Sequence, residues 1–371
     1  MKGELKKIPV AAHRQSVENV PFKVRTKLEV DRIFFQPEVE FYDRGQEVLD
    51  RYPDAERIVV DSHWRIPALR DDEAIVPEWN RVKRTTLVLG VRKSMPIREN
   101  GRSADFIAPG HANGCAMACA YCYVARRKGT SNPISVFVND DEILQSLRKH
   151  AATLGPKPEL QTDPTLWTYD IGEGSDCSVD AAVCGSVRAL VEGFRDIPNG
   201  KATFATKAVN EAMLDYDPRG KTRIRFSLMP TDVARRLDVR TDPVPERIRA
   251  IGPFWEAGYE VHVNFSPVVL YDGWEADWRA LFREVDDTIP AGAKAQLKAE
   301  IIFLTHSPEL HETNLLWHPK AEDLLWRPEI QEPKENSTTL RYRRGFKGEQ
   351  VRRFREILAE EMPYCGVRYA F

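Results

Sequence analysis

Three cysteines within one short segment could hold a metal centre. Cys115, Cys119 and Cys122 follow a Cys-x3-Cys-x2-Cys spacing, in a predicted loop after the strand Asp105–Ala108. Thiolates are soft ligands that favour iron–sulfur clusters, zinc and copper(I). A structural zinc ion needs four ligands, commonly in two separated pairs, and only His111 stands nearby as a fourth. The spacing therefore favours a four-iron cluster with one iron open to a small molecule, and structural zinc is the alternative.

The composition bounds what this chain can be. It has 371 residues, of which 42% are hydrophobic and 30% charged, and a formal net charge of −2. Such a chain can bury a large core, and at ~150 residues per domain it suggests two or three units or one large α/β barrel. Six cysteines are too few for a disulfide scaffold, and no apolar run reaches the ~18 residues of a membrane span. We therefore expect neither a secreted mini-protein nor a membrane protein. Because clustered thiols must stay reduced, we expect a cytoplasmic location.

A regular alternation of strands and helices is expected to position the cysteines. From residue 104 to about 310, short apolar runs alternate with helix-like segments, which predicts βαβ units and a parallel sheet. Six such units predict a partial (β/α)6 TIM-like barrel, in which the chemistry belongs at the C-terminal ends of the strands. The predicted strands are Asp105–Ala108, Leu166–Ile171, Thr203–Thr206, Arg223–Leu228, Glu260–Phe265 and Glu300–Leu304, and the helices lie near 140–152, 179–194, 208–214, 243–257 and 274–286.

Two further segments flank the predicted barrel. Residues 1–103 mix strand-like runs with turns and predict a small α/β extension. After residue 310 the alternation lapses, and residues 311–371 contain a basic segment, a helix (Lys347–Glu361) and a terminal strand (Gly366–Phe371) that complete one side of the barrel. The predicted division is therefore 1–103, 104–310 and 311–371.

The cysteine spacing, with an aromatic residue just before the last cysteine, resembles the signature of radical S-adenosylmethionine enzymes. In these enzymes the open iron binds S-adenosylmethionine, and one electron from the 4Fe–4S cluster cleaves the sulfonium to give a 5′-deoxyadenosyl radical. From about residue 30 to the C-terminus the chain resembles one family, the spore photoproduct lyases, which repair the ultraviolet thymine dimer of dormant spores. The segments that carry this resemblance are Thr86–Lys93, Cys115–Tyr123, Glu173–Asp176, Phe204–Lys207, Gly220–Ser227, Tyr271–Trp274 and Arg341–Gly345.

The resemblance implies a set of cofactor residues. Three of them also follow from the strand pattern, because Ser175, Lys207 and Ser227 each fall at the C-terminal end of a predicted strand. Hydroxyls there can bond a ribose or an amino group, and a lysine can meet a carboxylate. The alternative is a turn serine or a solvated lysine. By the resemblance, the cluster ligands are Cys115, Cys119 and Cys122, and the contacts to S-adenosylmethionine are Tyr121, Ser175, Lys207 and Ser227.

The chain departs from the family at one catalytic position. The family has a cysteine there that returns a hydrogen atom to the thymine radical, whereas this chain has Glu173. The O–H bond of a carboxyl group is too strong for that task, so we expect Glu173 to bond the substrate, to act as a base, or to pair with Lys207. Cys177, expected in the same loop, could supply the hydrogen by another path, whereas Cys184 is expected to pack inside a helix. Tyr123 matches a family tyrosine thought to relay the radical.

Two stretches of the chain are locally basic, Asn80–Arg102 and Lys334–Arg355. Clustered arginines with interleaved aromatic residues suit phosphate contact and base stacking, and a dimer within a duplex must first leave the stack. The family uses a hairpin at the Arg341–Gly345 position to wedge the strands apart. The alternative is that these stretches are solvated faces. The predicted nucleic-acid contacts are Arg341, Tyr342, Arg343 and Arg344.

Three hypotheses for the function follow. The first is a radical S-adenosylmethionine lyase that repairs a thymine lesion in DNA with a changed hydrogen donor. The second has the same cofactors and fold but another DNA lesion, nucleic acid or nucleotide as its substrate. The third is a metal protein that binds nucleic acid without chemistry. For the two enzymes we expect an external electron donor of the flavodoxin or ferredoxin type.

Overall fold

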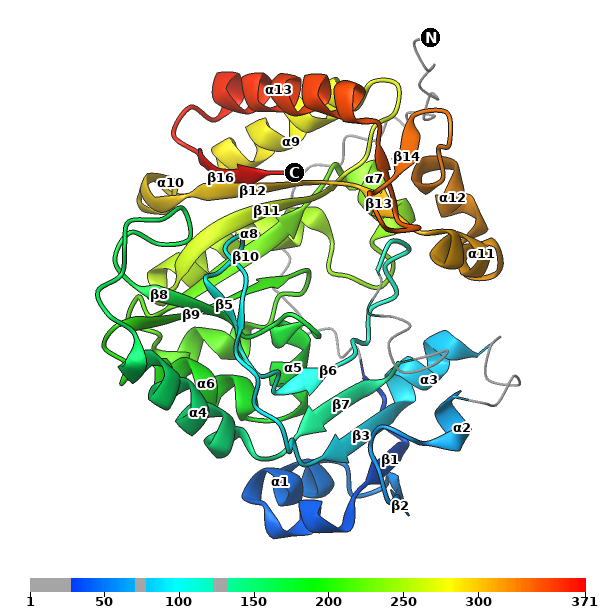
Figure 1. The fold of residues 1–371 in the computed structure, drawn as a ribbon, viewed down its shortest axis with the longest axis vertical. Helices are drawn as coiled ribbons and strands as arrows, with labels where there is room; N and C mark the ends of the chain where they lie inside the picture. The colour runs from blue at the N-terminus through cyan, green and yellow to red at the C-terminus, as the bar shows by residue number, and fades with distance from the viewer. Residues whose placement is uncertain (1–27, 71–77, 123, 125–131) are drawn as a thin grey trace.

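A curved eight-stranded sheet forms the centre of the fold in the computed structural model, which describes residues 28–70, 78–122, 124 and 132–371 (Figure 1). Seven of its strands run parallel, and β4 pairs antiparallel with β5 at one edge. The six strands predicted for the barrel are all present, so the partial α/β barrel is confirmed. In sheet order the strands are β16 (Gly366–Ala370), β12 (Lys298–Phe303), β11 (Glu260–Val268), β10 (Thr222–Leu228), β9 (Gly200–Thr206), β8 (Trp167–Asp170), β5 (Phe106–Ile107) and β4 (Arg98–Glu99).

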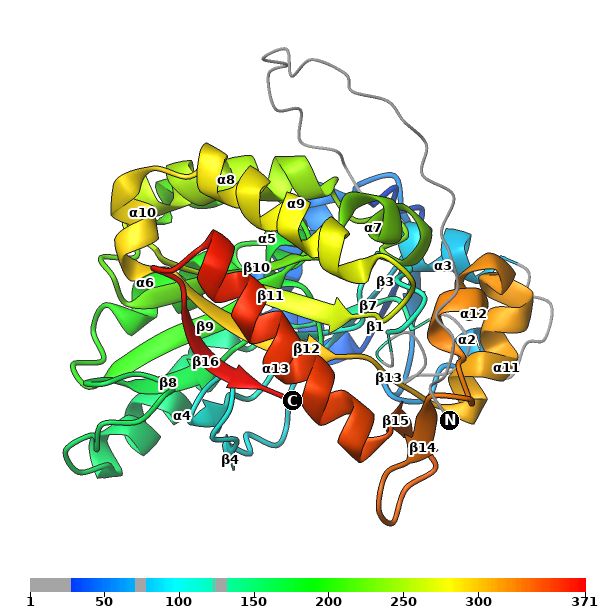
Figure 2. The ribbon, with the colours of Figure 1, turned by 90° about the horizontal axis from the view of Figure 1, so that it is seen from above.

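Helices cover the outer side of this curved sheet (Figures 1 and 2). The central strands are buried on both faces, as in other covered parallel sheets, and all seven residues of β10 are buried although its side chains alternate between apolar ones and polar ones such as Arg223 and Arg225. The covering elements are α4 (Asp140–Thr153), α5 (Cys177–Val183), α6 (Ser186–Phe194), the 3-10 helix η4 (Glu211–Tyr216), α7 (Thr231–Leu237), α8 (Val244–Glu256), α9 (Trp274–Thr288), α10 (Ala291–Gln296) and α13 (Arg344–Glu361).

Two helix predictions need correction. The single helix predicted near 179–194 is broken between α5 and α6, and the helix predicted near 208–214 is the 3-10 helix η4. At the break, a Cβ atom on Gly185 would lie 2.5 Å from Nη1 of Arg44. The guanidinium group of Arg44, from the N-terminal part of the chain, therefore packs closely against the break.

A second sheet of five strands packs beside the first and holds the cysteine segment. Its order is β2-β1-β3-β7-β6, and the cysteines lie between β6 and β7, two short strands that were not predicted. Segments 1–103 and 104–310 thus exchange strands, because β6 and β7 join the N-terminal sheet while β4 joins the barrel. The elements of this part are β1 (Arg32–Phe35), η1 (Pro37–Phe41), α1 (Asp43–Arg51), β2 (Glu56–Val59), α2 (Pro67–Arg70), α3 (Trp79–Thr85), β3 (Thr86–Gly90), β6 (Ala112–Asn113) and β7 (Ile134–Phe137).

The C-terminal part adds a small antiparallel sheet beside the rim of the barrel. Its order is β13-β15-β14, and Figure 2 shows the β14–β15 hairpin projecting at the edge of the molecule. Its elements are β13 (Thr305–His306), α11 (Pro308–Trp317), α12 (Pro319–Leu325), β14 (Gln331–Pro333) and β15 (Leu340–Tyr342). The terminal strand predicted at Gly366–Phe371 is β16, which pairs with β12 and extends the barrel.

Candidate radical S-adenosylmethionine site

A cavity of about 190 Å³ opens where the strands of the barrel end. It brings together the three cysteines and all four residues predicted to contact S-adenosylmethionine. Ser175 follows β8, Lys207 follows β9 directly, and Ser227 lies near the end of β10, because neighbouring parallel strands end at one rim. The lining residues are Lys83, Cys115, Met117, Cys119, Tyr121, Cys122, Val124, Gly172, Ser175, Asp176, Ala205, Thr206, Lys207 and Ser227.

The backbone of the cysteine segment is held from two sides. The amides of Ala118 and Ala120 donate to the carbonyls of Val239 and Leu237, at 3.0 and 2.9 Å. From the other side, Nδ2 of Asn314 donates to the Ala120 carbonyl at 2.6 Å. These bonds fix the loop without using the thiols, and all three cysteines are free.

The network behind Asn314 is a buried carboxylate and two imidazoles. Asn314 Nδ2 also donates to Oε1 of Glu322 at 2.6 Å, and a nitrogen of His306 and one of His311 lie against Oε2 of Glu322, at 3.1 and 2.5 Å. Glu322 thus supports the loop through Asn314. Sequence reasoning missed this support, because its residues are brought together only by the fold.

The spacing of the thiols suits a cluster better than a single ion. Four sulfurs on one zinc lie ~3.8 Å apart, as Zn–S bonds of about 2.3 Å in a tetrahedron require. In the described part of the chain, two groups of His, Cys, Asp or Glu bring their ligand atoms within 4.8 Å of one another, and the three cysteines form neither of them. His111, the fourth ligand that a zinc site would need, belongs instead to a buried group with Cys177 and Asp180. The donor set therefore fits a 4Fe–4S cluster with three protein ligands.

Burial favours the protonated thiols of Cys115 and Cys119. It raises the pKa of Cys115 to about 12, with the charge of Asp176 acting in the same direction. Burial, and then the charge of Asp238, also raise the pKa of Cys119 well above its ordinary value. Thiolates are the metal-binding form, so loading of this site must release protons.

Lys207 and Tyr121 share one carboxylate that sequence reasoning missed. The hydroxyl of Tyr121 donates to Asp238, and Nζ of Lys207 lies 3.4 Å from the same carboxylate. Arg247 donates to Asp238 at 2.9 Å. Burial lowers the pKa of Lys207, whereas the charge of Asp238 opposes that shift. Asp238 therefore orients two of the residues predicted to contact the cofactor.

Asp176 fixes the loop that carries Ser175. Its Oδ1 accepts from the amide of Ser178 at 3.1 Å and from the hydroxyl of Thr206 at 2.7 Å, and its Oδ2 accepts from the amide of Lys207 at 3.0 Å. As the N-cap of α5 it ties the ends of β8 and β9 together. Ser175 and Lys207 thereby have a fixed separation on the rim.

Two of the residues predicted to be catalytic, Glu173 and Cys177, do not line the cavity. Glu173 does not line the cavity and is paired with Arg98, so the predicted alternative of a pair with Lys207 is wrong. Cys177 is the first residue of α5 rather than a loop residue, and its side chain is fully buried. A Cβ atom on Gly172 would lie 3.2 Å from its sulfur, so Cys177 sits behind this cavity-lining glycine. Cys184 is buried at the end of α5. Tyr123 lies outside the described residues.

The predicted nucleic-acid residues divide into exposed and buried ones. Arg343 and Arg344 are exposed where β15 meets α13, and Arg341 is partly exposed, with Nε 3.4 Å from Glu332. Tyr342 is fully buried, and its hydroxyl accepts from the amide of Leu270 at 2.9 Å. Tyr342 therefore anchors the hairpin in the core and offers no ring to a base.

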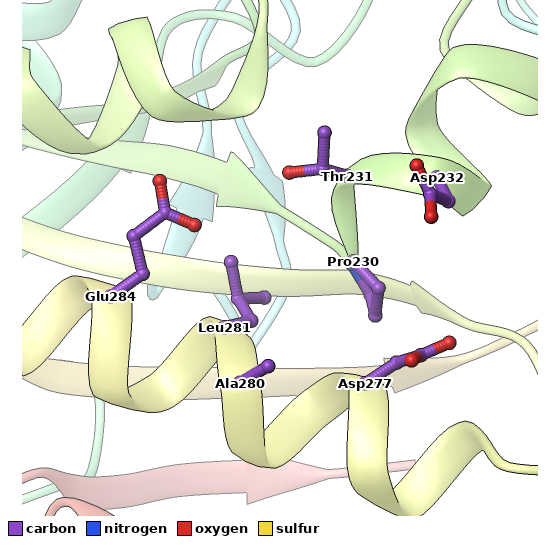
Figure 3. Close-up of a pocket in the computed structure, with 7 residues that line it drawn as sticks. All are labelled: Pro230, Thr231, Asp232, Asp277, Ala280, Leu281 and Glu284. Atoms are coloured by element: carbon purple, nitrogen blue, oxygen red, sulfur yellow. The ribbon is translucent and has the colours of Figure 1, made fainter. Parts of the chain in front are cut away.

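A second hollow, of about 230 Å³, lies between the start of α7 and one face of α9 (Figure 3). Its polar lining is mainly acidic, with Asp232, Asp277 and Glu284. Asp277 accepts from the hydroxyl of Tyr271, and Asp232 pairs with Arg235. Burial raises the pKa of Glu284. None of the predicted site residues lines this hollow, so it does not compete with the cysteine cavity for the function.

Comparisons with known proteins show which proteins this chain resembles. The family model described as "Spore photoproduct lyase" matches residues 28–320. The chain is 28% identical to a spore photoproduct lyase of Bacillus subtilis (strain 168) and 27% identical to one of Geobacillus sp. (strain Y412MC61). Each match covers 73% of this chain and 77% of the relative.

Solved structures of spore photoproduct lyase have the same fold. One, complexed with dinucleoside spore photoproduct, has a TM-score of 0.84 at 23% identity and covers 93% of this chain and 100% of its own. Another, a variant with bound AdoMet and dinucleoside spore photoproduct, has a TM-score of 0.83 at 22% identity and the same coverage. No helix in the described residues is long and apolar enough to cross a membrane.

Proposed function

This chain belongs to the spore photoproduct lyase family, and we propose that it is a radical S-adenosylmethionine lyase that repairs a thymine dimer lesion in DNA. The observation that carries the proposal is the shared cavity of the three cysteines with Tyr121, Ser175, Lys207 and Ser227. A protein that only bound nucleic acid would have no use for these rim residues around a metal centre. The buried thiols also support work in a reducing cytoplasm.

Each residue of the cavity has a separate task in this proposal. Cys115, Cys119 and Cys122 would hold a 4Fe–4S cluster, whose electron would cleave S-adenosylmethionine to a 5′-deoxyadenosyl radical. Lys207 meets the carboxylate of S-adenosylmethionine, since its ammonium lines the cavity and is only loosely paired with Asp238.

The remaining rim residues orient the cofactor. The hydroxyls of Ser175 and Ser227 can bond its ribose or amino group. The hydroxyl of Tyr121 donates its hydrogen bond to Asp238, so we assign the ring of Tyr121 to the wall of the cavity. Buried walls exclude water, which strengthens the polar contacts between the rim residues and the cofactor.

DNA is the proposed partner, and the β14–β15 hairpin is the proposed contact. Arg341, Arg343 and Arg344 present cations at its base, which suit phosphates. A solved relative complexed with dinucleoside spore photoproduct supports this class of substrate. An external one-electron donor of the flavodoxin or ferredoxin type is required.

A second candidate function keeps the cofactors and changes the substrate. Glu173 stands where the family has its hydrogen-donor cysteine, and Arg98 holds its carboxylate. Among the described residues, no cysteine other than the three proposed ligands lines the cavity. In this second candidate the substrate is another DNA lesion, nucleic acid or nucleotide whose product radical needs no thiol.

One experiment separates these functions. The chain is loaded with iron and sulfide without oxygen, reduced with dithionite, and given S-adenosylmethionine with a dinucleotide spore photoproduct. We expect 5′-deoxyadenosine and repaired thymine in the dinucleotide, both measured by liquid chromatography, and neither from the Cys115→Ala variant. Formation of 5′-deoxyadenosine without thymine would favour the second candidate, and a protein that holds no iron would contradict both.

The Glu173→Cys variant sharpens the choice. If the thymine dimer is the substrate and only the donor has changed, a thiol at this position increases the yield of thymine per 5′-deoxyadenosine. The Glu173→Ser variant is the matched control, since it is of similar size but has no weak S–H bond. An equal yield from both variants would count against the thymine dimer as the substrate.

A further inference from the structure

Lys83 is a buried cation that the proposed mechanism does not use. It lies in the last turn of α3 and is only 2% exposed, yet it lines the cysteine cavity. Its Nζ donates to the carbonyl of Met117 at 2.7 Å, and the amide of Met117 in turn donates to Sγ of Cys115 at 3.4 Å. Nζ also lies 5.5 Å from the ring centroid of Trp79, which stacks on Trp317. Packing thus holds the ammonium group against the segment that carries the thiols.

Other buried lysines have a carboxylate partner. Lys201 lies 2.7 Å from Asp163, and Lys207 lies 3.4 Å from Asp238. For Lys83, no carboxylate of the described residues comes within ion-pair distance. A buried cation without a counter-charge is costly, so its partner must be sought among its other neighbours. Those neighbours are the cysteines of the cavity.

A loaded cluster would supply the missing negative charge. Three thiolates outweigh the doubly positive core of an oxidised 4Fe–4S cluster by one charge, and reduction by one electron adds a second. A fixed cation beside this site stabilises the reduced form more than the oxidised form, because Coulomb attraction grows with the charge and is strong where water is excluded. Net charge and hydrogen bonds near the sulfurs are the terms that set cluster potentials.

We propose that the ammonium group of Lys83 is the built-in counter-charge of the cluster and raises its reduction potential. The inference rests on the proposed function, since it requires that the three cysteines hold a cluster. The electron comes from the external flavodoxin- or ferredoxin-type donor, and no proton or bond changes place at Lys83. Lys83 is thus a positioning residue that makes the first electron transfer easier.

Three variants separate the charge of Lys83 from its hydrogen bond and its bulk. Lys83→Gln keeps a donor for the Met117 carbonyl but removes the charge, Lys83→Arg keeps the charge, and Lys83→Met keeps neither. Lys149→Met, at an exposed position on α4, is the matched control for the loss of one positive charge. After anaerobic loading, the iron content and the midpoint potential of each protein are measured, the latter by a redox titration followed by electron paramagnetic resonance.

We expect equal iron content and at least a tenfold shift of the reduction equilibrium toward the oxidised form in Lys83→Gln, which is 59 mV for a one-electron couple. Lys83→Arg and Lys149→Met should stay within threefold of the parent protein. A parent-like potential in Lys83→Gln would overturn the inference, and so would a shift in Lys83→Met alone, because that would assign the effect to the hydrogen bond. Failure of the parent protein to hold iron would instead overturn the proposed function itself.

Discussion

Two buried polar clusters lie in this barrel, and they differ in whether their charged groups have partners of opposite charge. The interior network consists of Asp170, Arg225, Glu300 and Arg368, where Arg225 bridges the two carboxylates at 2.6 and 2.8 Å and Arg368 pairs with Glu300 at 2.7 Å. The rim cluster consists of the three cysteines, Lys83, Lys207 and Asp238, and it surrounds a cavity. In the first cluster the two arginines pair with the two carboxylates, whereas in the second the ammonium group of Lys83 has no carboxylate partner among the described residues.

The directions of the pKa shifts express the same difference. Burial opposes the charge of Glu300, but Arg225 and Arg368 outweigh it and lower the pKa of that carboxyl. At the rim, burial prevails, raising the pKa of Cys115 and lowering that of Lys207. The interior network thus favours the charged form of Glu300, whereas burial at the rim favours the neutral forms of Cys115 and Lys207. This contrast separates a structural cluster from a ligand site.

Breaking the interior network should have the largest effect on stability. The Glu300→Gln change leaves Arg225 and Arg368 sharing one fewer counter-charge in a fully buried place. We expect the free energy of unfolding to fall by about 3–5 kcal/mol, the usual cost of leaving a buried charge unpaired. Urea denaturation followed by circular dichroism measures this loss.

Glu192→Gln is the matched control for that experiment. Glu192 lies on the exposed side of α6, 3.7 Å from Arg188, where an ion pair contributes less than ~1 kcal/mol. Equal losses in the two variants would show that the interior network is no more stabilising than a surface pair, and the comparison would fail.

The barrel interior should also give stability a dependence on pH. Burial, followed by the charge of Arg223, lowers the pKa of His262 to about 4 against an ordinary 6.5, although Glu260 lies 3.0 Å away. As the pH falls, the unfolded chain therefore takes up the proton first. The contribution is complete above pH 6.5 and is lost between pH 6.5 and 4, by about 3 kcal/mol at 1.36 kcal/mol per pKa unit. Urea denaturation across this range measures it, and the His262→Gln variant should lose that part of the slope. A variant that keeps the full slope would assign the dependence to other groups.

Much of the rim could be predicted from the sequence, because parallel strands end at one edge. Ser175, Lys207 and Ser227 each follow or end a recognisable apolar run. The strand pattern was therefore enough to predict that these three residues lie close together at one rim. Lys83 and Asp238 could not be predicted in this way. Lys83 reaches the cavity from α3, and Asp238 reaches Tyr121 and Lys207 from the end of α7, and no spacing in the sequence links either residue to the cysteines.

Other errors have local causes. The strands β6 and β7 pair with the N-terminal sheet rather than with the barrel, so the alternation of strands and helices that predicted the barrel strands did not predict them. Tyr342 was expected to stack on a base because arginines flank it, but strand alternation turns its ring into the core while Arg341 stays partly exposed. Composition alone does not tell which side of a short strand is buried.

The smallest expected effect concerns two lysines at the ends of the same strand. Lys201 lies near the start of β9 and is paired with Asp163 and Glu260, whereas Lys207 follows the end of β9 and lines the cavity. Lys207→Met should weaken S-adenosylmethionine binding to the loaded enzyme by about 10- to 100-fold, since a hydrogen bond between charged groups contributes ~1.5–3 kcal/mol. Lys201→Met should instead reduce the free energy of unfolding and leave the affinity unchanged. Titration calorimetry measures the affinity of both variants for S-adenosylmethionine, and urea denaturation measures their free energies of unfolding. If Lys201→Met weakened binding as much as Lys207→Met, the cofactor site would depend on the whole charged interior of the barrel, and the interior network and the rim cluster would have to be treated as one system.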